Sequence, residues 1–176
     1  MLILEIDKRV KGELDTIWDI LTDTNCFCEA APDIIRVEQV SGEGLGMVRR
    51  IYHKSGRTWE EECTEWQPLS HFTMQVKTDD YPLPVTYLRR ITSMEQKQKN
   101  VVLKFRYEYT AKYGPLGIFL DKHQIRPILK IFSTQLADNV ATKIHQQNVD
   151  ITITAASILK DKSPETHTIT PETLIS

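Results

Sequence analysis

The amino-acid sequence predicts an α+β fold, in which a curved antiparallel sheet of seven strands wraps around one long C-terminal helix. Short stretches of alternating apolar and polar residues, typical of strands, open the chain and recur between residues 34 and 111. Two short helical patterns follow the first of these stretches. A single apolar stripe at helical spacing then extends to about residue 147, and a helix of that length should lie across a sheet rather than within a bundle.

The first three elements are delimited by local residues. Apolar residues alternate with charged ones from Leu2 to about residue 10, which predicts a strand that Gly12 ends. Apolar residues at helical spacing predict an amphipathic helix over 14–22. The polar segment 22–25 predicts a stop and a new cap, followed by a second helical turn over 27–31.

Six strands and their turns account for the middle of the chain. Gly56 lies in a hairpin turn at 54–57, where a positive φ favours glycine. The loop 79–84 contains two prolines, and a polar turn at 95–100 separates the two longest strands. The six expected strands are 34–40, 47–53, 58–66, 72–76, 85–94 and 101–111.

The segment Tyr113–Gly117 breaks the strand register, and the long helix follows it. Tyr113–Leu120, with glycines at 114 and 117, would serve as a movable entrance or as a rigid linker. Pro127 lies near the start of the helix and should kink it or divide it into two helices. The helix should contribute core, and the lid of a cavity if one exists. Its apolar face consists of Ile125, Leu129, Phe132, Leu136, Val140 and Ile144.

Composition divides the chain into one domain at residues 1–148 and a tail at residues 149–176. The tail is rich in Thr and Ser, contains two prolines and shows no sustained apolar period. We therefore expect it to be flexible or partly docked on the domain.

The overall composition argues against several classes of protein. With 40% hydrophobic and 26% charged residues in 176, it is typical of a soluble globular chain. A formal net charge of -2 provides no basic field for nucleic acid. No apolar run approaches the length of a membrane span, and the N-terminus lacks the features of a secretory signal. A cytoplasmic location is the resulting expectation, and the sequence indicates no oligomeric state.

The cysteines and histidines give no pattern of a metal site. Cys26, Cys28 and Cys63 are an odd number in a chain without a secretory signal, so we expect free thiols that are buried or half-buried. The C-x-C pair lacks a matching Cys or His pair, and no two of the five histidines have metal-binding spacing. The sequence therefore predicts no metal and no cofactor.

The stretch GRTWEEECTEW at 56–66 places a carboxylate on an otherwise apolar face. Trp59, Glu61 and Cys63 point to the same side of the expected strand, because side chains alternate with period two. If the hairpin loop is Ser55-Gly56, Arg50 lies opposite Glu61, with Val48 and Tyr52 on the same face. A loop of another length would bring Arg49 or Ile51 to Glu61 instead.

Two interpretations of this face remain open. It is either the wall of a cavity, where a charge pair and aromatic side chains orient a polar group of an apolar ligand, or a solvent-facing salt bridge that contributes little to stability. A buried pair would need further hydrogen bonds or a ligand. Trp59 and Cys63 are poor choices for a wet face and favour the cavity.

A second apolar face comes from the last strand. Phe105, Tyr107 and Tyr109 alternate with charged residues, which places the aromatic side chains inside. Their hydroxyls either contact a ligand or bond within the core. Tyr87, on the neighbouring strand, is a weaker candidate for the same role.

Several local phrases stand out in this element order, namely TIWDILTD at 16–23, APDI at 31–34, GLGMVR at 44–49, WEE at 59–61, WQP at 66–68 and YGPLG at 113–117. Through these phrases the sequence resembles the helix-grip (SRPBCC) superfamily over residues 1–147. That superfamily includes pollen-allergen proteins, START-like lipid-transfer domains and polyketide cyclase/dehydrase relatives, and the sequence looks like the last branch. The resemblance implies the fold and does not specify a reaction.

The leading hypothesis is a protein that binds a hydrophobic or aromatic small molecule, such as a lipid, quinone or polyketide, for transport or sensing. The alternative is a polyketide cyclase/aromatase or dehydratase that uses Glu61 or a tyrosine of the same cavity as acid–base. A third hypothesis is a protein-interaction role, like that of the chaperone activators in this superfamily. The candidate cavity residues are Arg50, Tyr52, Trp59, Glu61, Tyr87, Phe105, Tyr107, Tyr109, Leu129, Phe132 and Leu136.

Overall fold

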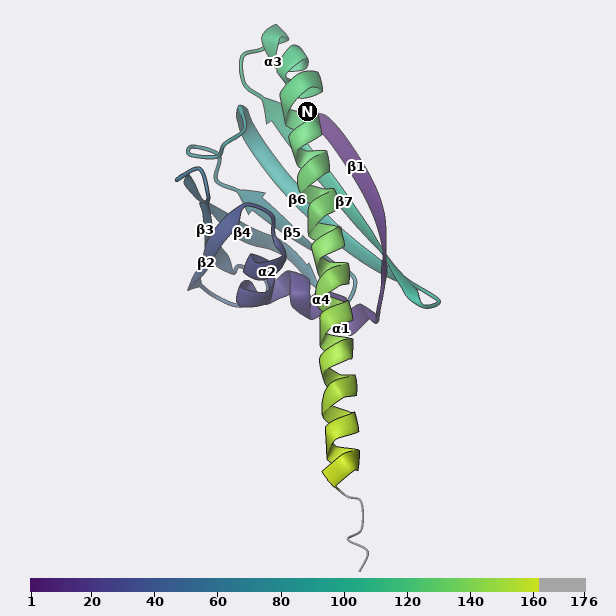
Figure 1. Cartoon of the computed structure of the whole chain (residues 1–176). Helices are drawn as coiled ribbons and strands as arrows, with labels where there is room; N and C mark the ends of the chain where they lie inside the picture. Colours follow the sequence, from purple (N-terminus) through teal and green to yellow (C-terminus); the bar gives the residue numbers. More distant parts are fainter. Residues whose placement is uncertain (162–176) are drawn as a thin grey trace, which may run out of the picture. The chain divides into compact units, whose positions relative to one another are not determined.

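The computed structural model describes the backbone of residues 1–161 and the side chains of residues 1–154. The chain divides into two structural units, residues 1–144 and the part from His145 onward. The first unit contains one antiparallel sheet in the order β1-β7-β6-β5-β4-β3-β2 (Figure 1). Its elements are β1 (Leu2–Lys11), α1 (Leu14–Thr22), α2 (Thr24–Ala30), β2 (Ile34–Ser41), β3 (Val48–His53), β4 (Thr58–Gln67), β5 (His71–Val76), β6 (Val85–Lys97) and β7 (Asn100–Ala111).

These bounds confirm the predicted α+β helix-grip fold, element by element. The predicted strands agree with the observed ones to within three residues at each end, and the helix predicted over 14–22 is α1. Alternation was sufficient for strands such as β4 and β6, because one of their faces is more buried than the other. Gly56 has the positive φ, 81°, that the hairpin turn required.

The C-terminal helix is divided near Pro127, as one of the two predicted outcomes. α3 (Pro115–Leu120) leads into η1 (Asp121–Ile125), a π-helical turn, and α4 (Arg126–Asp161) follows. Pro127 is the second residue of α4, directly after the wider turn. That turn gives room to the proline ring, which in a regular helix would collide with the carbonyl four residues earlier.

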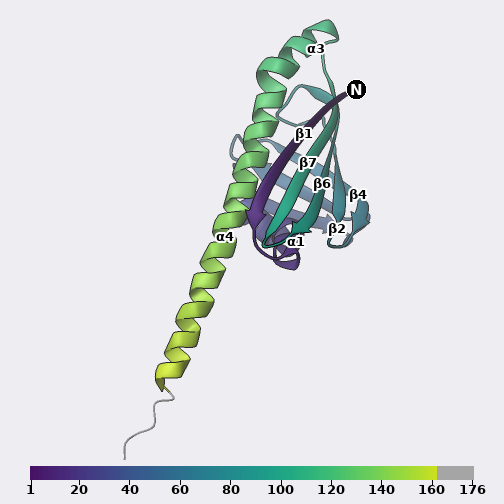
Figure 2. The same cartoon turned by 90° about the vertical axis from the view of Figure 1, so that its right-hand side faces the viewer.

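The part of α4 up to Ile144 runs along the inner face of the sheet (Figure 2). Tyr107 on β7 and Ser133 on α4 share a hydrogen bond of 2.8 Å between their hydroxyls. At the start of the helix the Tyr109 hydroxyl donates to Asp121 Oδ1, and Arg126 Nε donates to Asp121 Oδ2 at 2.8 Å. These bonds anchor the π-helical turn and α4 to the last strand.

Gly117 allows α3 to approach β7 closely. A Cβ at this position would lie 2.6 Å from the Lys112 carbonyl oxygen, which is closer than real side chains come. Any larger residue would push α3 away from the end of the strand.

The two short helices close one end of the sheet. Trp18 of α1 packs edge-on against Trp66 and Phe72, with ring centroids 5.0 and 5.7 Å apart. The Asp23 side chain accepts a hydrogen bond from the Cys26 backbone N–H at 2.8 Å and caps α2, as the polar stop had predicted.

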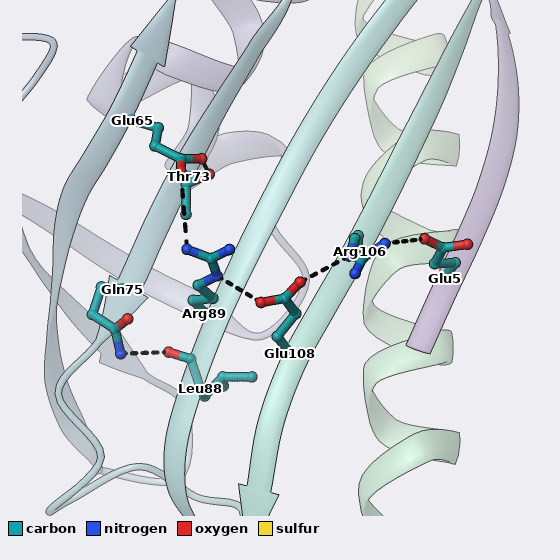
Figure 3. Close-up of polar contacts among 8 residues, drawn as sticks. All are labelled: Glu5, Glu65, Thr73, Gln75, Leu88, Arg89, Arg106 and Glu108. Carbon is teal, nitrogen blue, oxygen red and sulfur yellow. Dashed lines mark hydrogen bonds and ion pairs between the residues drawn. The ribbon is translucent and has the colours of Figure 1, made fainter. Parts of the chain in front are cut away.

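The outer face of the sheet, opposite α4, carries a row of ion pairs (Figure 3). Arg106 binds Glu5 and Glu108 at 2.9 Å each, and Arg89 binds the other oxygen of Glu108 at 2.8 Å. Arg89 also lies 3.9 Å from Glu65, which accepts a hydrogen bond from the Thr73 hydroxyl. We call Glu5, Arg106, Glu108, Arg89 and Glu65 the outer ladder.

α4 continues to Asp161, beyond the predicted helix end near residue 147. Of the predicted tail at 149–176, residues 149–161 are therefore helical, and residues 162–176 lie outside the described part of the chain. The division into a domain at 1–148 and a flexible or partly docked tail stays a prediction. None of the described helices is both long and apolar enough to span a membrane.

Candidate functional site

The β3–β4 hairpin pairs Arg49 with Glu61 and Ile51 with Trp59. The preferred register, with Arg50 opposite Glu61, is wrong by one residue, and the alternative with Arg49 is correct. The hairpin loop consists of residues 54–56 and is one residue longer than the expected Ser55-Gly56. Next to the paired residues Tyr52 and Thr58, the His53 N–H donates to the Arg57 carbonyl oxygen at 3.0 Å and closes this loop. Because side chains alternate, the slip moves Arg50 and Tyr52 to the opposite face from Glu61.

Arg50 and Tyr52 consequently make contacts away from the interior. Arg50 binds Glu60 at 2.8 Å, and the Tyr52 hydroxyl donates to Glu38 at 2.8 Å. Neither side chain lines the cavity described below.

Three charged side chains form a buried cluster on the inner face. Arg49 donates from Nε and Nη2 to Glu61 Oε2, at 3.1 and 2.8 Å. Arg90 of β6 lies on the same oxygen, with its Nη2 at 3.6 Å. The exposed fractions of the three residues are 1%, 5% and 6% for Arg49, Glu61 and Arg90. We call these three residues the inner cluster.

Aromatic side chains surround the inner cluster. The guanidinium carbons of Arg49 and Arg90 lie 4.0 and 5.6 Å from the ring centroid of Phe27, on α2. Arg90 is also 5.9 Å from the Phe132 ring, and Trp59 Nε1 donates to Glu61 Oε1 at 3.3 Å. Contacts of cations with ring faces offset part of the cost of burying the two guanidinium groups.

All three groups of the inner cluster stay ionised, including Arg49, because its guanidinium keeps its proton at neutral pH although burial lowers its pKa. Burial alone would raise the pKa of Glu61, but attraction to Arg49 and Arg90 and hydrogen bonds from Arg49 and Trp59 outweigh it and hold that pKa below its ordinary value. Burial also opposes the charge of Arg90, yet attraction to Glu61 leaves the pKa of Arg90 raised. Glu61 is therefore a carboxylate and Arg90 a cation at neutral pH.

A cavity of about 70 Å³ lies between the inner face of the sheet, α2 and the start of α4. It has space for about five water-sized groups, since each needs roughly 10–15 Å³. Glu61 and Arg90 contribute charge to a wall that is otherwise mainly apolar and aromatic. The other lining residues are Phe27, Ile34, Ile51, His53, Trp59, Tyr81, Pro82, Leu83, Tyr107, Ile128, Leu129 and Phe132.

The sequence candidates separate into three groups in the structure. Trp59, Glu61, Tyr107, Leu129 and Phe132 line the cavity. Three others are buried in the core without lining it, namely Phe105, Tyr109 and Leu136. The remaining three candidates, Arg50, Tyr52 and Tyr87, do not line the cavity either. Tyr87 lies on the same face of β6 as Arg89.

The two candidate tyrosines of β7 have different surroundings. Tyr109 bonds to Asp121 and belongs to the packing of the π-helical turn. Tyr107 lines the cavity while its hydroxyl bonds to Ser133. Burial raises the pKa of the Tyr107 hydroxyl, so this group is protonated at neutral pH.

Sequence reasoning missed Arg90, Phe27 and Tyr81 as site residues. Arg90 could have been found from the sequence, because it lies two residues from both Leu88 and Thr92 and so shares their buried face of β6. Phe27 and Tyr81 lie in a short helix and a loop, where no periodicity indicates which side chains point inward. Tyr81 packs edge-on against Trp59, with ring centroids 5.0 Å apart.

Comparisons with known proteins support the fold. No protein-family model and no curated protein matches the sequence. Solved structures do match: norcoclaurine synthase from Thalictrum flavum in complex with dopamine and hydroxybenzaldehyde is 16% identical with a TM-score of 0.63, over 82% of this chain and 87% of that one. The crystal structure of Ara h 8.0201 is 12% identical with a TM-score of 0.62, over 82% of this chain and 98% of that one.

A third match is BexL, a di-domain ARO/CYC protein of the BE-7585A biosynthetic pathway. It is 16% identical with a TM-score of 0.69, over 80% of this chain and 46% of that one. These similar structures are helix-grip proteins, and together with the sheet and helix described above they show that this chain has the helix-grip fold. At these identities the likeness concerns the fold, and the site must be argued from its own residues.

Proposed function

We propose that this protein binds a hydrophobic or aromatic small molecule in the cavity between its sheet and its C-terminal helix, for transport or sensing. The observation that carries the proposal is the cavity itself, which has aromatic walls and one small charged region. Binding sites for small molecules commonly combine a mainly apolar lining with a few polar groups that fix orientation. Burial of apolar ligand surface would supply the affinity, at about 25 cal/mol per Å² before ordering costs.

The cavity is small, so binding of a large ligand would require lining side chains to move. Pockets that enclose drug-sized ligands have volumes of about 300–1,000 Å³, so this cavity of about 70 Å³ fits only part of such a ligand. A larger ligand would displace lining side chains at the edge of the cavity. Ile128 is one of these, because it lines the cavity and is also exposed to solvent.

Similar structures are consistent with such a role. The norcoclaurine synthase structure holds dopamine and hydroxybenzaldehyde, two small aromatic molecules. The inference for this chain nevertheless depends on its own lining residues, because the shared fold alone does not define a function.

The cyclase or dehydratase hypothesis is less well supported by the geometry. A general base working near neutral pH needs a carboxyl pKa close to that pH, whereas ion pairing holds the pKa of Glu61 low. Besides the loss of stability that removal of a buried carboxylate causes, simple binding predicts that Glu61→Gln changes ligand affinity. An acid–base role for Glu61 predicts instead that turnover collapses while binding is kept.

Native mass spectrometry of the protein purified from its own host tests the proposal. We expect a retained lipid, quinone or polyketide of defined mass in the wild-type protein. Leu129→Phe, which adds a ring at the cavity wall, should lose most of it, because the ring fills the space the ligand needs.

Leu136→Phe is the matched control, because Leu136 is equally buried on α4 but does not line the cavity. The control should keep the ligand while losing about 1–3 kcal/mol of stability through overpacking. Leu129→Phe should lose less stability than that, since a cavity is present to receive the ring. Retention of the ligand by Leu129→Phe, or a wild-type protein that carries none, would contradict the proposal.

A further inference from the structure

The inner cluster has one more positive charge than negative. Arg49 and Arg90 are both cations, and Glu61 is the carboxylate that lies between them. All three are buried, so solvent does not screen the excess charge. An unbalanced charge in such a site is costly unless another group of opposite sign approaches it.

Arg90 also has an unused hydrogen-bond donor. Its Nε is buried and has no hydrogen-bond partner among the described residues. Its Nη2 lies 3.6 Å from Glu61 Oε2, which is an ion-pair distance but too long for a hydrogen bond. Arg49, by contrast, donates two hydrogen bonds to that oxygen and does not line the cavity. Of the two arginines, Arg90 is therefore the one that a molecule in the cavity can contact.

No other group in the described cavity wall supplies the missing negative charge. Burial raises the pKa values of Tyr81 and Tyr107, so both are neutral phenols. Burial lowers the pKa of His53, which favours its neutral form. Glu61 is already engaged by Arg49, so the counter-charge has to come from a molecule in the cavity.

We propose that the ligand of this cavity is an amphipathic acid whose carboxylate binds Arg90, with its apolar part against the aromatic wall. The proposal rests on the proposed function and names the chemical class of the ligand. A guanidinium group offers parallel donors that match the two oxygens of a carboxylate. Trp59, Phe27 and Phe132 lie around the inner cluster and would contact the apolar part.

Two probes of nearly equal shape separate charge from hydrophobic contact. 2-Naphthoate carries a carboxylate, whereas 2-naphthamide replaces it by a neutral amide on the same ring system. We expect isothermal titration calorimetry to give at least about a tenfold tighter dissociation constant for 2-naphthoate, because hydrogen bonds to charged groups exceed neutral ones by about that much.

Neighbouring arginines of β6 provide the variant and its control. Arg90→Met removes the unpaired donor and leaves Arg49 and Glu61 as a balanced pair, so its preference for 2-naphthoate should disappear. Arg89→Met removes the preceding arginine, which belongs to the outer ladder and binds Glu108. This control should keep the preference of the wild-type protein.

The outcomes of this binding test separate the acid-specific inference from the proposed hydrophobic binding. Equal binding of both probes to the wild-type protein, or a preference that survives Arg90→Met, would overturn the acid-specific inference and leave hydrophobic binding intact. Failure of both probes to bind the wild-type protein would overturn both proposals. The wild-type comparison alone is decisive if Arg90→Met does not fold.

Discussion

The inner cluster and the outer ladder use the same residue types on opposite faces of one sheet. Consecutive residues are divided between the faces: Arg89 belongs to the outer ladder, and Arg90 belongs to the inner cluster. In the outer ladder each arginine is placed between glutamates, and most of its members are partly exposed. In the inner cluster two buried arginines share one carboxylate.

We take burial, rather than residue type, to distinguish the candidate site from the outer surface, because the outer ladder also has unequal charges, with three glutamates and two arginines. Exposed ion pairs have water and salt as alternative partners and contribute little individually. Buried charges have neither, so each one depends on its neighbours and an imbalance favours a ligand. The same comparison predicts very different effects of glutamate substitutions on the two faces.

The largest effect is expected for Glu61→Gln. This change leaves Arg49 and Arg90 buried without a counter-charge, and breaking a buried pair in this way costs about 3–5 kcal/mol. Urea denaturation should show the loss, and 2-naphthoate should restore part of it by supplying a carboxylate to Arg90.

Glu62→Gln is the control for that measurement, because Glu62 is the next residue of β4 and its side chain is exposed on the other face. Its free energy of unfolding should stay near that of the wild-type protein. A loss below about 1 kcal/mol in Glu61→Gln would show that the inner cluster does not depend on its carboxylate.

Acid should reduce the stability difference between the wild-type protein and Glu61→Gln. The pKa of Glu61 is lower in the folded protein than its ordinary value of 4.5, so its ionised form stabilises the fold. That contribution is complete above pH 4.5 and is lost as the pH falls through the lower folded-state pKa. The difference in free energy of unfolding should therefore be large at pH 7 and much smaller near pH 3. A difference that is constant over this range would contradict an ionised Glu61.

The fold was predictable from the sequence because strands such as β4 and β6 have one face more buried than the other, and alternating apolar and polar residues record this directly. The cross-strand partner of Glu61 was not predictable from the sequence. A change of one residue in the length of the hairpin loop places Arg49 instead of Arg50 opposite Glu61 and moves every side chain of β3 to the other face. Arg49 and Arg50 are adjacent and face a run of three glutamates at 60–62, so the alternation of these charges does not select one register. Arg90 could have been found from its buried neighbours Leu88 and Thr92.

The smallest effect is expected for Glu5→Gln at the edge of the outer ladder. Glu5 is half exposed, and its loss leaves Arg106 bound to Glu108, so denaturation should detect no clear change in stability. Any small change should vanish at 1 M salt, because screening acts on exposed charges. The Glu61→Gln effect should persist at that salt concentration, since solvent ions do not reach the buried inner cluster. If Glu5→Gln destabilised the protein as much as Glu61→Gln, burial would not be what separates the two faces, and the excess charge of the inner cluster would no longer indicate an acidic ligand.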